Sequence, residues 1–353
     1  MNNKNLLYLN LAIDDKDVSL GFANTWIEQF SRKFENIDII TLNKSTESIG
    51  KNNNVNIYGL IKSDNSSKFI KILKIRKIIK DLTSTTNYDL CFSHMSPLLL
   101  LMTKIYGLNS FPKILWYTHP KPKELSKKII LILSLLVSNK VVTASKSSFP
   151  YKSSKVNVIG HAIDYELFLN KKEKVVNKEF IIISRISKSK NLEIAINGFL
   201  NSKFKNYNIS LVGDAVTKED EDYKNKLLKK YANNNNVTFL GKIPHKALPD
   251  LLKKYSYHIN ATPKGFYDKS VLEAISAGLF SFYSNEDYNK HFKKDLNSYT
   301  KFELNQKSLI EVLDSVYDQE EKNILRIIQS GQLSVSDESI QTIFERVTAT
   351  VAS

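Results

Sequence analysis

Short apolar runs alternate with longer amphipathic segments along most of the chain. The short runs predict buried strands, and the segments with apolar residues three or four positions apart predict helices. The expected strands are 6–12, 37–42, 55–60, 88–92, 113–117, 140–144, 156–159, 180–183, 208–212, 237–240 and 257–260. The expected helices include 22–34, 68–82, 97–106, 129–137, 192–200, 220–231 and 248–255. This alternation in both halves predicts an α/β protein with two doubly wound parallel sheets, each in a Rossmann-like domain.

A charged segment from Lys171 to Lys178 separates the two series of strands and helices. We therefore expect an N-terminal domain over 1–165 and a C-terminal domain over 166–335. The region from about Asn305 to Val351 is predicted to be helical, with polar breaks at Ser330-Gly331 and at Ser334–Asp337. Residues 336–353 are expected to form a C-terminal helix that packs back towards the N-terminal domain.

Composition agrees with two packed domains and limits the class of protein. The chain has 353 residues, 42% hydrophobic, which is enough for two cores and argues against global disorder. Its single cysteine, Cys91, excludes an internal disulfide and lies in an apolar run, which favours a core position over a nucleophile. The formal net charge is +15. A basic functional surface and a general compositional excess of Lys, beside abundant Asn and Ile, both explain this charge.

Membrane signals are weak. The start of the chain reads as a first strand rather than a signal peptide. The most apolar run, Ile129–Val137, is well short of the roughly 20 residues that span a bilayer, and it predicts a buried helix. In the helix expected over 68–82, Lys and apolar residues are spread around the helix without clean separation, so this helix alone does not indicate a membrane surface.

The clearest candidate for chemistry is GFYDKSVLEAISAG, from Gly265 to Gly278. Its pattern predicts a loop that leads into a short helix, with Asp268 to Ser270 in or before the first turn. Such a helix start presents unpaired N–H groups and partial positive charge, which suit a diphosphate. Glu273, about one turn further, could accept hydrogen bonds from a sugar hydroxyl. Taken alone, the same pattern also describes an ordinary surface helix with a solvated Glu.

Other kinds of site lack support in the sequence. The six histidines are scattered and Cys91 is alone, so we expect no metal site. No Walker-type phosphate loop or Ser/His/Asp order stands out. The sequence also lacks a nucleic-acid-binding motif, so nucleic acid is not an expected partner.

Several segments, taken together and in order, resemble retaining glycosyltransferases of family 4, which have the GT-B fold. The resemblance covers roughly Leu6 to Asn285. The segments are LGFANTWIEQFSRKF (20–34), WYTHPKP (116–122), VIGHAID (158–164), SRISKSKNLEIAINGF (184–199), LVGD (211–214), VTFLGKIPHKALPDLLKKYS (237–256) and GFYDKSVLEAISAG (265–278). It implies two Rossmann-like domains that face each other across a cleft, with the acceptor on the first and the donor on the second.

The resemblance also implies roles for individual residues. Arg185 and Lys190 match the Arg and Lys that clamp the donor diphosphate and neutralise charge as the nucleotide leaves. Glu273 matches the Glu that holds the nucleotide ribose, and His119 matches a His near the transferred sugar. Gly21 matches the glycine of the first loop, where the backbone approaches the donor diphosphate and the acceptor.

Asp268, Lys269 and Ser270 occupy the backbone segment that faces the diphosphate and the sugar in this family. The expected donor-binding residues are Gly21, Arg185, Lys190, Gly213, Gly241, Lys269, Ser270, Val271 and Glu273. The expected catalytic residues are His119, Asp268, Arg185 and Lys190.

One position departs from the family pattern. Many members have a second acid about eight residues before the ribose-binding Glu, and that acid binds the transferred sugar. Here the position is Gly265, and the segment resembles a DK-x-x-LEA variant with Asp268 as its acid. Whether Asp268 replaces the missing carboxylate, and which sugar it would recognise, stays open.

The function implied is a retaining hexosyltransferase that needs no metal and no cofactor. Its donor would be a UDP- or GDP-linked sugar, and its acceptor a glycan or glycolipid of polysaccharide biosynthesis. Closure near Gly160–Asp164 would exclude water. The expected location is the cytoplasm, and the apolar run and Lys excess could bring the protein to an anionic membrane at its inner face. The alternative is a non-catalytic nucleotide-sugar-binding or glycan-assembly protein with the same fold.

Overall fold

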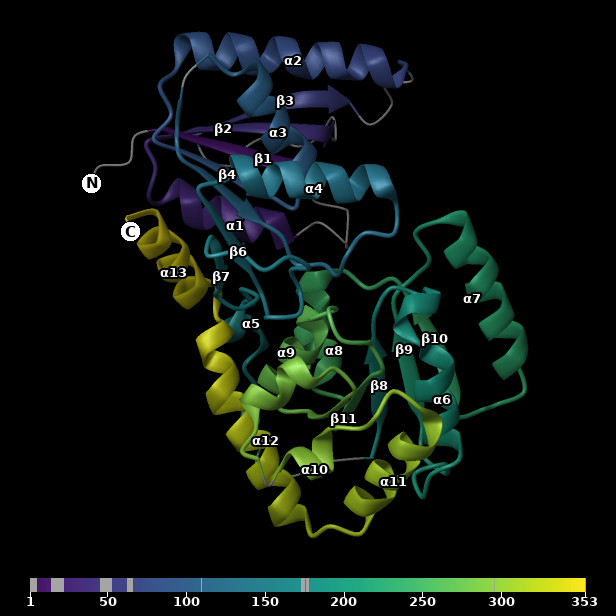
Figure 1. Ribbon diagram of the computed structural model, residues 1–353. Coiled ribbons are helices and arrows are strands. Elements are labelled where there is room, and N and C mark those ends of the chain that lie inside the picture. The colour runs from purple at the N-terminus through teal and green to yellow at the C-terminus, as the bar shows by residue number, and fades with distance from the viewer. Residues whose placement is uncertain are drawn as a thin grey trace. The chain divides into compact units, whose positions relative to one another are not determined.

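A computed structural model describes residues 5–13, 22–44, 53–61, 66–108, 110–172, 175, 178–294 and 296–352. The chain divides into two compact units. Unit 1 comprises Met1–Gly160 together with Ile340–Ser353, and unit 2 comprises His161–Ser339. Each unit contains a parallel sheet wound on both faces by helices, which confirms the predicted fold class. Figure 1 shows the helices and strands of both units.

The described part of unit 1 contains a seven-stranded parallel sheet with the order β3-β2-β1-β4-β5-β6-β7. These strands are β1 (Asn5–Ile13), β2 (Asn36–Lys44), β3 (Val55–Ile61), β4 (Leu90–His94), β5 (Lys113–Trp116), β6 (Lys140–Thr143) and β7 (Val156–Val158). The order reverses between β1 and β4, so connections on the two sides of that point leave in opposite directions. In open parallel sheets this reversal marks the edge where ligands bind.

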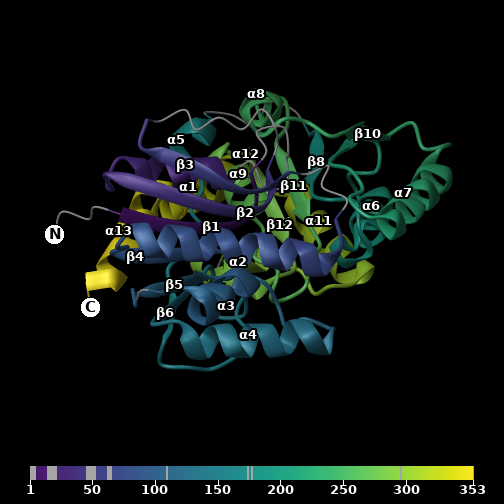
Figure 2. The same ribbon diagram turned by 90° about the horizontal axis from the view of Figure 1, so that it is seen from above.

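Helices cover both faces of this sheet. Figures 1 and 2 show α2 (Lys68–Thr85), α3 (Pro97–Tyr106) and α4 (Leu125–Val137) on one face. The contacts of α1 (Phe22–Ser31) with β1 and β2, and of α13 (Ile340–Ala352) with α1 and β6, place these two on the other face. The Phe30 and Phe344 rings meet edge to face at 4.8 Å, and Arg346 donates to the Ile159 carbonyl at 2.8 Å. The last helix of the chain therefore completes the first unit.

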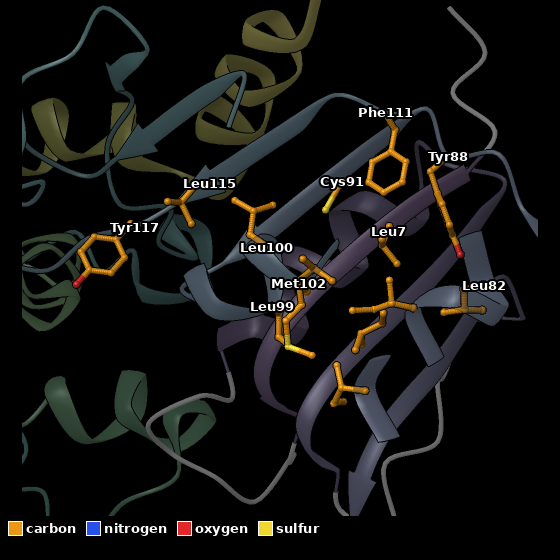
Figure 3. Close-up of a cluster of buried hydrophobic side chains, with 14 of the residues drawn as sticks. Leu7, Leu82, Tyr88, Cys91, Leu99, Leu100, Met102, Phe111, Leu115 and Tyr117 are labelled. Atoms are coloured by element: carbon orange, nitrogen blue, oxygen red, sulfur yellow. The ribbon is translucent and has the colours of Figure 1, made fainter. Parts of the chain in front are cut away.

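The core beneath α2, α3 and α4 is apolar and includes the lone cysteine (Figure 3). Cys91 is fully buried beside Leu7 and Leu100, and burial raises the pKa of its thiol to about 12. A thiol with that pKa stays protonated near neutral pH and is a poor nucleophile. The prediction that Cys91 is a core residue is confirmed.

The helix expected to be buried between Ile129 and Val137 is largely exposed on its outer side. In α4 only Leu131 and Ser134 are buried. The prediction was wrong because α4 packs against α3 and β5 along one side and no described element covers the other. An apolar sequence indicates that a helix can be buried, whereas burial itself depends on its neighbours.

The described part of unit 2 contains a five-stranded parallel sheet with the order β10-β9-β8-β11-β12. The strands are β8 (Phe180–Ile183), β9 (Ile209–Val212), β10 (Val237–Gly241), β11 (Tyr257–Asn260) and β12 (Phe280–Tyr283). The order reverses between β8 and β11. Strand β12 is absent from the sequence prediction, because its short FSFY run directly follows the helix-ending Gly278.

Two groups of helices cover this sheet. The first group comprises α6 (Leu192–Leu200), α7 (Lys218–Tyr231), α10 (Asn297–Thr300) and α11 (Gln306–Tyr317). Helix α11 contacts both α6 and α10, and an ion pair joins α6 to α7. Helices α5 (Tyr165–Phe168), α8 (Leu248–Leu252), α9 (Lys269–Ser276) and α12 (Glu321–Val335) form the second group. Four 3-10 turns complete the described part of the unit: η1 (Lys188–Lys190), η2 (His245–Ala247), η3 (Glu286–His291) and η4 (Ser336–Glu338).

Helix α12 runs without interruption through the break expected at Ser330-Gly331. A Cβ atom on Gly331 would lie 2.9 Å from the Phe292 ring and 3.0 Å from Ile275. Gly331 is thus a packing glycine inside a helix rather than a helix end, and the predicted break was wrong. The second break, at Ser334–Asp337, coincides with the end of α12 and the turn η4.

Candidate functional site

The candidate residues of unit 2 lie after strands β8, β9, β10 and β11, on both sides of the point where the strand order reverses. Arg185 follows β8, Gly213 follows β9, and Gly241 ends β10. Asn260 ends β11, and the loop after it leads to Asp268. Because all these strands are parallel, their carboxyl ends meet at one edge of the sheet.

Lys190, in the loop after β8, forms an ion pair with both carboxylate oxygens of Asp268, in the loop after β11. Lys190 Nζ lies 2.6 Å from Asp268 Oδ1 and 2.7 Å from Oδ2. Asn260 also donates to Oδ2, at 3.1 Å. Burial raises the pKa of Asp268, but the Lys190 charge and the hydrogen bonds from Lys190 and Asn260 outweigh it and hold this pKa below its usual value. Asp268 is therefore an ionised acceptor and has no proton to deliver near neutral pH.

Backbone and ring contacts hold this pair in place. Asn191 adopts a left-handed conformation with φ of 48° and donates from its side chain to the Ala261 carbonyl at 3.0 Å. The Lys190 ammonium lies 5.3 Å from the centre of the Phe266 ring. Tyr288 donates its hydroxyl to the Asp268 carbonyl at 3.0 Å. The loop that leads into α9 is thus tied to β11, η1 and η3.

The N-terminus of α9 lacks a side-chain cap. Asp268 is the N-cap residue, with extended backbone, but its side chain makes no capping hydrogen bond. An N-cap Asp usually accepts from an N–H of the first turn. Here the carboxylate is turned to Lys190 and does not cap the first turn of α9. A helix start of this kind attracts anions.

The Lys269 side chain is partly buried within unit 2. Its Nζ donates to the Ala162 carbonyl at 2.8 Å. Burial lowers the pKa of its ammonium to about 8, against the opposing charges of Glu273 and Asp164. The group keeps its charge near neutral pH and adds to the positive potential at the start of α9.

Glu273 is almost completely buried and is held by a histidine that the sequence analysis left without a role. His245 Nε2 and Glu273 Oε1 are 2.8 Å apart. Burial lowers the pKa of His245, but the hydrogen bond and charge of Glu273 outweigh it, so the pKa is raised above its ordinary value. His245 lies within the matched segment 237–256, but a contact with a residue 28 positions later leaves no local signal.

Arg185 and two glycines border the same edge of the sheet. The Arg185 side chain is exposed, and it makes no ion pair within the described part of the chain. Gly213 has φ of +138°, and a Cβ atom there would lie 1.8 Å from the Ser184 carbonyl oxygen. Gly241 has φ of +69° with open space around it. The glycine at 213 is required because two strand ends approach so closely.

The remaining predicted residues belong to unit 1 or lie outside the described residues. His119 is an exposed residue that follows β5, and the rings of Tyr117 and His119 meet edge to face at 6.3 Å. Gly21 lies outside the described residues. The structure therefore gathers the predicted residues of unit 2, from Arg185 to Glu273, at one edge of one sheet.

A second buried polar cluster, which the sequence analysis missed, ties the α9 loop to the end of unit 2. The Glu338 carboxylate accepts from the His161 backbone N–H and from Lys290, each at 2.5 Å, and from the Tyr267 hydroxyl at 3.3 Å. Tyr267 also contacts His291 Nε2 at 2.6 Å. Tyr267 directly precedes Asp268, so this cluster helps to fix the position of the Lys190–Asp268 pair.

Two kinds of feature are absent from the described residues. They contain no group of three or more His, Cys, Asp or Glu that could hold a metal ion. No helix among them is long and apolar enough to cross a bilayer.

Comparison with known proteins relates this chain to a protein family. Residues 166–332, almost all of unit 2, match the family model described as glycosyl transferases group 1. Unit 2 is therefore similar to the group 1 glycosyl transferases. The resemblance to glycosyltransferases is thereby confirmed, whereas family 4 and the DK-x-x-LEA variant stay predictions. No curated protein matches the chain in sequence.

Solved structures share the fold of the whole chain. Anabaena HepE in complex with UDP-glucose has a TM-score of 0.76 at 15% identity, with 99% of each chain covered. Sucrose-phosphate synthase from Thermosynechococcus elongatus has a TM-score of 0.80 at 12% identity, with 98% of each chain covered. A mutant of S. aureus TarM with fondaparinux, α-GlcNAc-glycerol and UDP has a TM-score of 0.68 at 10% identity, covering 99% of this chain and 100% of that one. At these identities the likeness extends to the GT-B fold alone.

Proposed function

We propose that this glycosyltransferase moves a sugar from a UDP- or GDP-linked donor to a glycan or glycolipid acceptor. The observation that carries the proposal is the uncapped start of α9, with the Lys190–Asp268 pair beside it, inside the segment that matches the family. Backbone N–H groups and a fixed cation together suit a diphosphate.

In this proposal the bond from the anomeric carbon to the diphosphate breaks, and the acceptor oxygen bonds to that carbon with retention of configuration. Lys190, Arg185 and the N–H groups of α9 stabilise the charge that develops on the leaving diphosphate, without a metal ion. Glu273 accepts from the ribose hydroxyls.

Asp268 takes the place of the acid that is missing at Gly265. It is ionised and fixed by Lys190 and Asn260, so it can accept a hydrogen bond from a hydroxyl of the transferred sugar. The Lys190 ammonium would then contact both Asp268 and the diphosphate. This arrangement links recognition of the sugar to stabilisation of the leaving group.

Calorimetric titration of the full chain with UDP and with GDP tests the donor half of the proposal. We expect one nucleotide to bind, with Glu273→Ala weakening it about tenfold because a ribose acceptor is lost. Glu193→Ala, on the exposed part of α6, is the control and should bind like the wild type. Failure of the wild type to bind either nucleotide would contradict the proposal.

We also propose that unit 1 works at an anionic membrane, through the outer faces of α3 and α4. The exposed apolar residues of α4 recur at positions i, i+4, i+7, i+8 and i+11, so they share one face: Leu125, Ile129, Ile132, Leu133 and Leu136. Leu98, Ile105 and Leu108 are exposed on and just after the neighbouring α3. Exposed apolar residues gathered on one helix face mark an interaction site.

Charge favours a lipid surface over a second copy of the chain. Helix α2 carries six Lys or Arg and one Asp, α3 carries one Lys, and α4 carries two Lys. Two copies of this side of unit 1, with the neighbouring α2 included, would repel each other, whereas anionic lipid headgroups attract it. A membrane location also suits a glycolipid acceptor.

Flotation with phosphatidylglycerol vesicles tests this surface. The double variant Leu125→Gln/Leu136→Gln should bind vesicles at least about tenfold more weakly, because two apolar side chains no longer insert. Leu333→Gln, at a leucine that is 77% exposed in unit 2, is the matched control. High salt should weaken wild-type binding. A wild type that stays unbound and forms a dimer that the double variant abolishes would contradict the proposal.

A further inference from the structure

His245 is the polar contact of Glu273 that no predicted role explains. It lies on the turn η2, after β10, and Glu273 lies on α9, after β11. Glu273 is 4% exposed, and the contact between His245 Nε2 and Glu273 Oε1 is 2.8 Å long. A buried carboxylate without partners would be costly, so this contact sets the direction of the Glu273 side chain.

The imidazole is itself held in place. Its ring lies against the ring of Phe168 on α5, with centroids 5.2 Å apart. The charged groups that act on it are Glu273 and Lys269 of α9 and Asp164, the N-cap of α5. Elements from three parts of unit 2 therefore converge on the imidazole that contacts Glu273 Oε1.

We propose that His245 is a positioning residue for nucleotide binding: it holds Glu273 Oε1, so that Oε2 is directed to the ribose hydroxyls of the donor. This inference rests on the proposed function and deepens it, because it assigns control of the ribose contact to a residue outside the α9 segment. His245 itself does not touch the sugar that is transferred. Its loss should therefore weaken nucleotide binding more than it slows transfer at saturating donor.

The contact also makes nucleotide binding depend on pH. A protonated imidazole donates to the ionised carboxylate, and its positive charge lies near an anionic ligand. Because Glu273 raises the pKa of His245, this charge is present at lower pH and is lost as the pH rises through that pKa. Nucleotide affinity should accordingly fall as the pH rises. Lys269, whose pKa is lowered to about 8, titrates nearby and contributes a second loss of charge.

Calorimetric titration with UDP and GDP between pH 6 and about pH 8.5 separates these contributions, since this range spans the ordinary pKa of histidine. His245→Gln keeps an N–H donor without the charge, His245→Ala removes both, and Lys246→Ala changes an exposed neighbour on η2 as the control. We expect His245→Ala to weaken nucleotide binding about tenfold at pH 6, with KM for the donor raised and kcat changed by less than about threefold. His245→Gln should recover part of that affinity. The nucleotide affinity of His245→Gln should also lose the pH dependence that comes from His245 and keep only the pH dependence that comes from Lys269.

Three results would overturn the inference. Nucleotide affinity in His245→Ala equal to that of Lys246→Ala would overturn it while leaving the proposed function standing, and so would wild-type pH dependence in His245→Gln. A wild type that binds neither UDP nor GDP at any pH would overturn the proposed function and this inference together. Thermal unfolding of each variant shows whether a loss of binding comes from a loss of folding.

Discussion

Lys190→Ala should lower the rate of nucleotide release from the donor sugar by about 100-fold or more, the usual effect of removing one fixed group that stabilises developing charge. Its ammonium lies 2.6 and 2.7 Å from the two oxygens of Asp268 and, in our proposal, beside the leaving diphosphate. Released UDP or GDP, measured under saturating donor, gives the rate directly. The effect should fall mainly on kcat, because the charge develops as the bond breaks.

Lys188 provides a matched control on the same 3-10 turn. It forms an exposed surface pair with Glu219, and such pairs contribute little. Lys188→Ala should keep the wild-type rate within about twofold, the range expected of a surface substitution. A Lys190→Ala rate equal to that of Lys188→Ala would contradict the role of Lys190.

Folding has to be separated from catalysis in Lys190→Ala, because Asp268 then stays partly buried without its cation. We expect the free energy of unfolding to fall by roughly 2–3 kcal/mol. The double variant Lys190→Ala/Asp268→Asn removes the unpaired charge, so it should recover much of that stability and none of the activity. Urea unfolding of the three proteins checks this.

Gly213→Ala should be the most destabilising of the single-methyl changes proposed here. A Cβ atom would meet the Ser184 carbonyl oxygen at 1.8 Å, and φ of +138° is itself unfavourable for a residue with a side chain. We expect a loss of roughly 3 kcal/mol or more in the free energy of unfolding, because one of two paired strand ends must move. The added methyl group would clash with a backbone atom, so rotation of a side chain cannot relieve the clash.

Gly241→Ala is the paired comparison. Gly241 also has positive φ, at +69°, but nothing lies within 4 Å of its Cβ position. The change should therefore cost about 1 kcal/mol, the penalty of the left-handed conformation alone. Equal destabilisation by the two variants in urea unfolding would show that the close approach at Gly213 does not matter.

The periodicity of the sequence predicted eleven of the twelve strands that the described residues contain, and it placed the helices between them. Its errors have a common cause. FSFY at β12, the apolar face of α4 and Gly331 in α12 each depend on a neighbour distant in sequence. Local pattern identifies which segments can be buried or helical, whereas tertiary packing decides where they are.

The candidate site divides in the same way. The α9 segment and the Arg185–Lys190 loop were predictable, because each follows a strand and carries chemistry within a short stretch. Asn260, His245 and Glu338 were not, since each acts through a contact with a distant residue: Asn260 with Asp268, His245 with Glu273, and Glu338 with Tyr267. Their type and position give no sign of these partners. Such residues orient the predicted ones, and only the fold reveals them.

We infer that the uncapped start of α9 and the Lys190–Asp268 pair serve transfer from a nucleotide sugar. The most direct measurement is nucleotide release by the wild type and Lys190→Ala from a panel of UDP- and GDP-linked sugars, with a glycan or glycolipid acceptor present. We predict turnover of one donor by the wild type and its near loss in Lys190→Ala. Tight nucleotide binding without turnover of any donor would contradict the claim and favour a non-catalytic nucleotide-sugar-binding protein.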